Sequence, residues 1–148
     1  MFERQRANSS LCVDAGGGMS GFSIYNIESH IFRPYQIDGR EGVSIFYLYD
    51  ARQNAQGPAA ALVRYAAGAL TPRHLHQGWE LLQVIEGELI DDRGCHGPGI
   101  VQVYPPGSTH ELSSSTGCTF LVVWEQPVRP VTSPGASALD ALTPEALI

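Results

Sequence analysis

The sequence has 148 residues, of which 43% are hydrophobic and 16% charged. This length and balance are typical of one globular domain with a sizeable core, and they exclude a disordered chain. Nine arginines against fifteen acidic residues give a formal net charge of −6 without a basic run, so we expect no nucleic-acid partner. Lysine does not occur in the sequence, which excludes Schiff-base chemistry on a lysine.

The cysteines and the apolar runs indicate the compartment. Cys12, Cys95 and Cys118 are an odd number without paired spacing, and the first residues lack the apolar stretch of a signal peptide. No apolar run approaches the ~20 residues of a membrane span. We therefore expect a cytoplasmic protein that does not enter a membrane.

The predicted elements follow a flexible N-terminal arm, residues 1–21, which ends in a run rich in glycine. Beyond it, short apolar runs rich in Val, Ile, Tyr and Phe alternate with Gly and Pro. This pattern is typical of an all-β sandwich or barrel. The expected strands cover residues 43–49, 60–66, 79–85, 88–91, 100–103 and 119–124.

Turn residues and a change of composition set the remaining boundaries. Residues 92–99 and 105–107 contain the Gly and Pro that reverse a chain between neighbouring strands. Residues 22–125 are therefore predicted to form the single barrel domain. Residues 126–148 are rich in Pro, Ser and Ala, and we expect them to form a strap or a partly disordered tail.

Two segments carry the candidate metal ligands, at Gly68, His74, His76, Glu80 and Gly87 in one and at Gly99, Pro105, Gly107 and His110 in the other. Residues two apart in a strand point to the same side, so His74 and His76 face together. Glu80 keeps this parity if the strand bends without a bulge, and three ligands then come from one continuous piece. His110 must arrive from another strand, aimed by the rigid turn before it. The four glycines suit sharp corners where a Cβ would clash.

Three imidazoles and one carboxylate suit one divalent first-row metal ion per chain. Iron and zinc are the leading candidates, and manganese, nickel, cobalt and copper remain possible. Octahedral iron would keep two coordination positions open beside four protein ligands, whereas tetrahedral zinc would have a closed shell. The identity of the metal therefore separates a catalytic site from a sensing or structural one.

The spacing of these nine residues resembles the two-part signature of the cupin superfamily. Residues 86–92, 104–110 and 117–119 are most similar to the ChrR-type cupin domain. The resemblance implies an all-β cupin β-barrel, a double-stranded β-helix like a jelly-roll sandwich. It also implies a homodimer and metal ligands at His74, His76, Glu80 and His110.

Two departures from the family pattern limit what can be carried over. The general second motif ends in Asn, whereas this sequence has Ser114 at that place, so the role of that Asn is not assigned. Anti-sigma proteins of this type also carry a separate N-terminal sigma-binding domain with its own zinc ligands. Only the glycine-rich arm and one cysteine precede the barrel here, so an anti-sigma function is unsupported.

Three kinds of function stay open at this point. Related stand-alone cupins include dioxygenases that cleave β-diketones or hydroxylated aryl ketones, so the resemblance favours a non-haem iron dioxygenase acting on a small diketone or hydroxyketone. The alternative is a zinc-binding small-molecule or redox sensor without catalysis. Other cupin chemistry, such as isomerisation, is a third option.

Several other polar and aromatic residues are not predicted to bind the metal. His96 lies in a predicted turn and is expected to be exposed, and His30 has no partner pattern, so neither is a predicted ligand. Arg64 lies inside an apolar strand, where it either extends to solvent or meets an anionic ligand. Tyr65 and Tyr104 are expected in the core or lining the barrel.

Overall fold

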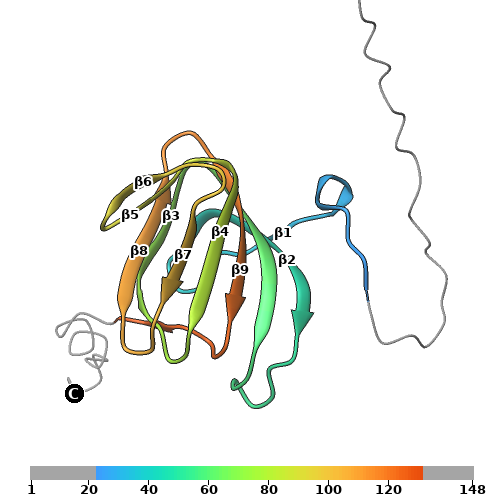
Figure 1. The fold of residues 1–148 in the computed structure, drawn as a ribbon, viewed down its shortest axis with the longest axis vertical. Helices are drawn as coiled ribbons and strands as arrows, with labels where there is room; N and C mark the ends of the chain where they lie inside the picture. The colour runs from blue at the N-terminus through green and yellow to red at the C-terminus, as the bar shows by residue number, and fades with distance from the viewer. Residues whose placement is uncertain (1–22, 132–148) are drawn as a thin grey trace, which may run out of the picture.

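The computed structural model describes residues 23–131. They form one ten-stranded antiparallel sheet that curls into a half-open barrel, as Figure 1 shows. A short 3₁₀ helix, η1 (Ile27–Ser29), precedes the sheet. The strands are β1 (Arg33–Pro34), β2 (Glu41–Asp50), β3 (Ala59–Leu75), β4 (Glu80–Gly87), β5 (Leu89–Asp91), β6 (Gly94–His96), β7 (Val101–Tyr104), β8 (Thr109–Ser114), β9 (Cys118–Trp124) and β10 (Arg129–Pro130).

The predicted all-β fold is confirmed, and the long strand β3 organises it. The main path of the sheet runs in the order β6-β5-β8-β3-β9-β4-β7, with β2 and β10 also paired to β3 and β1 to β2. The first half of β3 pairs with β2 and β9, and its last part pairs with β8 and β10. β3 thus connects the strands β2 and β9 to β8, the strand that carries His110.

The core lies inside the curl and follows the period-two pattern of the strands. Along β3, Ala61, Val63 and Tyr65 are buried while Arg64 between them is exposed. The buried cluster as a whole contains Val43, Ile45, Ala61, Val63, Tyr65, Ala69, Leu82, Val84, Leu89, Leu112, Cys118, Phe120 and Val122. Burial of this apolar surface is the main force that holds the sheet in its curl.

Glycine is required in the motif for two different physical reasons, a steric contact at one position and a positive φ angle at the others. At Gly87, with φ of +74°, an added Cβ would lie 2.1 Å from the carbonyl oxygen of Gly117. Gly68, Gly99 and Gly107 also have positive φ, but no atom lies within 4 Å of a Cβ built on them. The prediction that a Cβ would clash is therefore wrong for these three, which need glycine for its backbone freedom.

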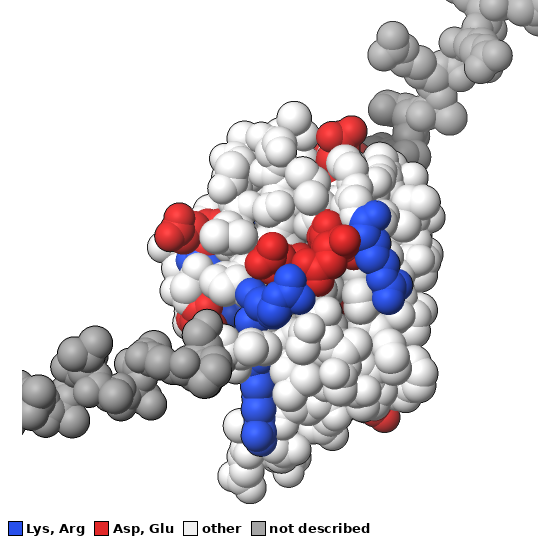
Figure 2. All heavy atoms as spheres, turned by 90° about the vertical axis from the view of Figure 1, so that its left-hand side faces the viewer, with Lys and Arg blue, Asp and Glu red and all other residues white. Residues whose placement is uncertain are grey.

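The edge formed by β5, β6 and β8 carries charges of both signs. Figure 2 views the molecule from this side and shows basic and acidic side chains next to one another. Arg73 on β3 lies 2.6 Å from Asp92 and 3.9 Å from Glu111. These exposed pairs contribute little to stability.

The boundary predictions at both ends fall largely on residues outside 23–131. The arm of residues 1–21 and the tail beyond Val131 lie outside the described residues. Within the described part, Arg129 and Pro130 form β10 beside Leu75 and His74. Among residues 23–131, no helix is long and apolar enough to cross a membrane.

Candidate metal centre

The structure brings the four predicted ligands together inside the barrel. His74 comes from the end of β3, His76 follows directly, Glu80 opens β4 and His110 lies on β8. Their potential ligand atoms all lie within 4.8 Å of one another. All four side chains are buried, none more than 5% exposed.

The ligand atoms converge on one point. The Nε2 atom of His110 lies 2.9 Å from Nε2 of His74 and 3.3 Å from Nε2 of His76. Oε1 of Glu80 lies 3.5 Å from Nε2 of both His76 and His110. Such a group of nitrogens and one carboxylate oxygen is the donor set of a first-row divalent metal.

The chain reaches this arrangement through a bulge and a tight connection. Between Thr71 and His74, three steps along β3 match two along β8, so the core-facing parity changes and His74 stands opposite His110. β3 then ends at Leu75 and β4 begins at Glu80. His74, His76 and Glu80 thus come from one continuous piece of chain, as expected, but this piece consists of two strand ends and the connection between them.

Two of the histidines are oriented by hydrogen bonds on their far sides. Nδ1 of His74 lies 3.0 Å from the carbonyl oxygen of Pro72, which can only accept, so His74 donates from Nδ1. The Ser108 hydroxyl donates to the carbonyl of Pro105 at 2.6 Å, so it accepts from Nδ1 of His76 at 2.9 Å. Both rings thus direct an Nε2 lone pair to the shared point.

The electrostatics of the group suit a cation. Burial lowers the pKa of His74, and it lowers the pKa of His110 to about 3, so both rings are neutral at neutral pH. Burial acts to raise the pKa of Glu80, but its contact with His76 and its electrostatic interactions with the three surrounding imidazoles outweigh it and hold this pKa below its ordinary value. The centre therefore offers neutral imidazoles and an ionised carboxylate.

Behind the ligands lies a polar cluster around Asp91 that the sequence did not reveal. The Tyr104 ring stacks on His76 at 5.1 Å and meets the edge of His110 at 4.3 Å, and its hydroxyl donates to Asp91 at 2.8 Å. Asp91 also accepts from Gln102 at 2.7 Å and from His96 at 2.8 Å. The prediction of an exposed His96 is wrong, because this contact holds it partly buried.

The structure also shows the positions of Arg64 and Ser114. Arg64 is exposed, and its guanidinium lies 4.0 Å above the Phe32 ring, away from the centre. The Ser114 hydroxyl donates to the carbonyl of Glu88 at 2.6 Å and accepts from Gly117 N at 2.9 Å. Ser114 thus secures the β8–β9 turn, which is a structural role.

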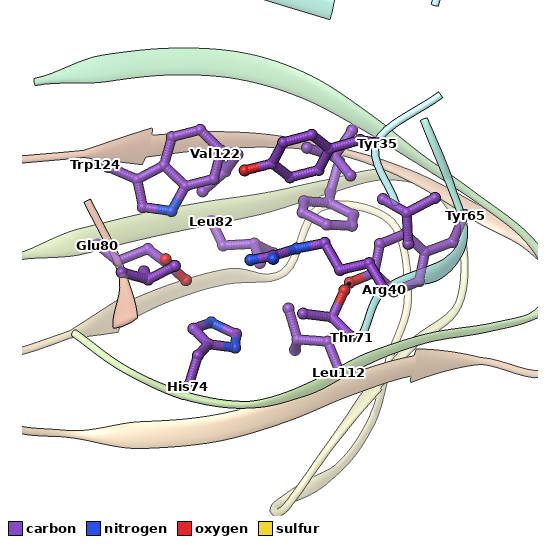
Figure 3. Close-up of a pocket in the computed structure, with 14 residues that line it drawn as sticks. Tyr35, Arg40, Tyr65, Thr71, His74, Glu80, Leu82, Leu112, Val122 and Trp124 are labelled. Atoms are coloured by element: carbon purple, nitrogen blue, oxygen red, sulfur yellow. Dashed lines mark hydrogen bonds between the residues drawn. The ribbon is translucent and has the colours of Figure 1, made fainter. Parts of the chain in front are cut away.

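A cavity of about 30 Å³ opens beside the centre. His74 and Glu80 form part of its wall, and Figure 3 shows both side chains facing the space that Leu82 and Leu112 also line. Arg40 and Tyr35 are also part of the wall, and Trp124 lies next to Glu80, its cross-strand partner. Sequence reasoning missed Arg40 because it lies in a polar turn, far along the chain from every ligand.

The family model of the ChrR cupin-like domain matches residues 33–128. The chain therefore belongs to this family, and its fold is the one that the sequence motif indicated. A search of curated protein sequences gave no significant match.

Several solved structures share the fold. The polyketide cyclase RemF from Streptomyces resistomycificus is 22% identical, with a TM-score of 0.63 over 77% of this chain and 88% of that one. An acetylacetone dioxygenase from Acinetobacter johnsonii is 14% identical, with a TM-score of 0.63 over 84% of this chain and 86% of that one. The Rhodobacter sphaeroides complex of SigE with the anti-sigma ChrR contains a chain that is 22% identical, with a TM-score of 0.55. That match covers 68% of this chain and 51% of the other, so this chain spans about half its length.

Proposed function

We propose that His74, His76, Glu80 and His110 bind one divalent metal ion and that the protein is a non-haem iron dioxygenase acting on a small diketone or hydroxyketone. The observation that carries the proposal is the position of His74 and Glu80 in the cavity wall, because a small molecule in the cavity would lie beside the metal centre. An acetylacetone dioxygenase has the same fold, which adds support.

The chain's own residues fit this chemistry. Bound iron(II) would supply a Lewis acid and the electrons needed for reaction with dioxygen. The oriented lone pairs of His74 and His76 hold such an ion, and the carboxylate of Glu80 offsets part of its charge. Leu82 and Leu112 give part of the cavity wall an apolar surface, and electrostatic interactions are stronger beside such a surface than in open water.

Oxygen uptake tests the proposal directly. Protein reconstituted with iron(II) should consume dioxygen with 2,4-pentanedione or with another member of a panel of diketones and hydroxyketones, and zinc-loaded protein should not. Glu80→Gln should lower the rate at least about tenfold by weakening the metal centre. The matched control is Glu86→Gln, since Glu86 is an exposed residue of the same strand. Inertness of the iron form across the whole panel would overturn the proposal.

The second candidate is a zinc-binding sensor without catalysis. Its support is the family itself, since the chain belongs to the ChrR cupin-like family and four protein ligands complete a tetrahedral zinc shell. The metal content of protein purified without a tag or added metal distinguishes the two. Near-stoichiometric iron favours the oxygenase, and near-stoichiometric zinc that also survives reconstitution in competition with iron favours the sensor.

A homodimer is part of the proposal. The outer face of the sheet carries one cross-strand row that contains Tyr49, Val123, Leu81 and Val103. Tyr49, Leu81 and Val103 are 46%, 38% and 54% exposed, an apolar surface suited to a second copy. Light scattering coupled to gel filtration should give a dimer mass that Val103→Glu reduces to the monomer. Val131→Glu, at a similarly exposed valine outside the row, should leave the dimer intact.

The cysteines support a cytoplasmic site of action. Cys95 is exposed and Cys118 is buried, and both are free thiols. Free thiols suit a reducing compartment. We therefore keep the cytoplasm as the proposed location.

A further inference from the structure

Arg40 is a buried cation with unused hydrogen-bond donors. Its side chain is 8% exposed and comes from the turn before β2. Nη1 donates to the carbonyl of Ile37 at 3.1 Å and to Asp38 at 3.2 Å, and the guanidinium lies 4.9 Å from the centre of the Tyr35 ring. Nε and Nη2 make no hydrogen bond with any residue between 23 and 131. Buried guanidinium groups normally use most of their donors, because an unpaired buried donor costs stability.

The free side of this guanidinium faces the cavity of the metal centre. Arg40 is part of the cavity wall, and Figure 3 shows its side chain between Tyr35 and Thr71, directed toward the part of the space where Leu82, His74 and Glu80 lie. The wall of the cavity therefore carries two ligands of the candidate metal centre and a positive charge that is directed toward them.

Neutral hydrogen-bond donors stand beside Arg40. Trp124 lines the cavity, and its indole nitrogen makes no hydrogen bond within the described part of the chain. Tyr35 extends its hydroxyl over the same space in Figure 3. Burial raises the pKa of Tyr35 to about 12, so this hydroxyl keeps its proton at neutral pH. Trp124 beside Glu80 and Tyr35 beside Arg40 thus add neutral polar groups to the cavity wall.

A second pocket continues the path outward from Arg40. It has a volume of about 100 Å³ and shares Tyr35, Arg40, Trp124 and Val128 with the inner cavity. Arg52 lines this outer pocket, paired with Asp50. A molecule that enters from the outer pocket therefore passes Arg40 before it reaches the metal centre.

We propose that Arg40 makes the cavity selective for a small dicarbonyl acid, whose carboxylate binds the free Nε and Nη2 donors while its dicarbonyl end faces His74 and Glu80. A carboxylate matches the two-pronged geometry of a guanidinium, and charge-assisted hydrogen bonds of this kind are strong. Asp38 does not fill this role, because it is 44% exposed and takes only Nη1. The orientation of the dicarbonyl end rests on the proposed function, whereas the carboxylate contact does not.

Binding to zinc-loaded protein tests the inference without turnover. Calorimetry compares 2,4-dioxopentanoate with its methyl ester, which keeps the dicarbonyl group and lacks the negative charge. The wild type should bind the acid at least about tenfold more tightly than the ester. Arg40→Gln should bring this ratio close to one, and Arg64→Gln, at an exposed arginine outside the cavity, should leave it unchanged. Metal chelation by each probe is the same in all three proteins, so the change in ratio isolates Arg40.

The outcomes separate this inference from the proposed dioxygenase. A wild-type ratio near one, binding of neither probe, or an unchanged ratio in folded Arg40→Gln overturns the inference. The wild-type ratio decides against it even if the variant fails to fold. An Arg40-dependent preference for the acid supports it, also when the iron form consumes no dioxygen with either compound. In that last case the proposed dioxygenase activity is contradicted, and the proposed binding of an acid by Arg40 is still supported.

Discussion

At the scale of single residues, Gly87 is where backbone geometry and packing leave no alternative to glycine. Its Cβ position would lie 2.1 Å from the Gly117 oxygen and 2.8 Å from Cα of Cys118. Gly87→Ala must therefore shift the β9 backbone, and we expect a loss of about 3 kcal/mol or more in the free energy of unfolding. Urea denaturation of the metal-free protein measures it.

Gly99→Ala is the matched control for this prediction. Gly99 has φ of +89°, but nothing lies within 4 Å of an added Cβ. Only the conformational penalty remains, so we expect a loss of about 1 kcal/mol. Equal losses at the two positions would show that the contact with Gly117 does not decide the cost at Gly87.

Residue patterns predicted the ligands of the candidate site but not its cavity. His74, His76, Glu80 and His110 were identifiable because their spacing is part of a motif that turn and strand geometry impose. Arg40 carries no such signal, since its burial arises only when the turn before β2 folds over the open end of the barrel. His96 was misplaced for the same reason, because its partner Asp91 lies across a hairpin.

At the scale of elements, β3 shows how far the position of a glycine predicts the end of a strand. The sequence predicted a strand that stopped at residue 66, shortly before Gly68. The observed strand continues to Leu75, because Gly68 adopts φ of +82° and bends the strand without ending it. Whether a glycine ends a strand or bends it depends on the strand that pairs beyond it, here β8, and local sequence does not contain that information.

The Asp91 cluster joins β5, β6 and β7, and it should make stability depend on pH. Burial acts to raise the pKa of Asp91, but hydrogen bonds from His96, Tyr104 and Gln102 outweigh it and hold this pKa far below its ordinary value. A carboxyl group whose pKa is lower in the folded state contributes stability above its unfolded pKa, about 4, and loses it as the pH falls toward the folded pKa. Asp91→Asn should remove about 1 kcal/mol of the difference in unfolding free energy between pH 7 and pH 3.

Denaturation of metal-free protein at both pH values tests this, because the metal then makes no contribution. Asp92→Asn is the control, since Asp92 is the next residue, exposed and paired with Arg73. Solvent screens that pair, so its loss should change the pH dependence much less. If both variants flatten the profile equally, burial of the Asp91 cluster is not the source of the acid sensitivity.

At the scale of the whole molecule, the candidate metal centre connects strands that are distant along the chain. His74 closes β3, Glu80 opens β4 and His110 lies on β8. An unfolded chain does not hold these groups together, so a metal that binds here binds the folded state and stabilises it. With free zinc at 100 times the dissociation constant, the gain is about 2.7 kcal/mol. For a domain of this size, this corresponds to a rise in melting temperature of about 10 °C.

Calorimetric melting of metal-free and zinc-reconstituted protein should show that rise, and two histidine variants locate its origin. His110→Ala removes one ligand from the buried group and should abolish most of the shift. His30→Ala removes a histidine that stacks on Phe46 at 4.3 Å, away from the centre, and should keep it. A full shift in His110→Ala would mean that zinc stabilises the fold from another place. The proposed activity depends on a metal ion held by His74, His76, Glu80 and His110. A full shift in His110→Ala would therefore mean that the metal does not bind beside the cavity in which the reaction is proposed to occur.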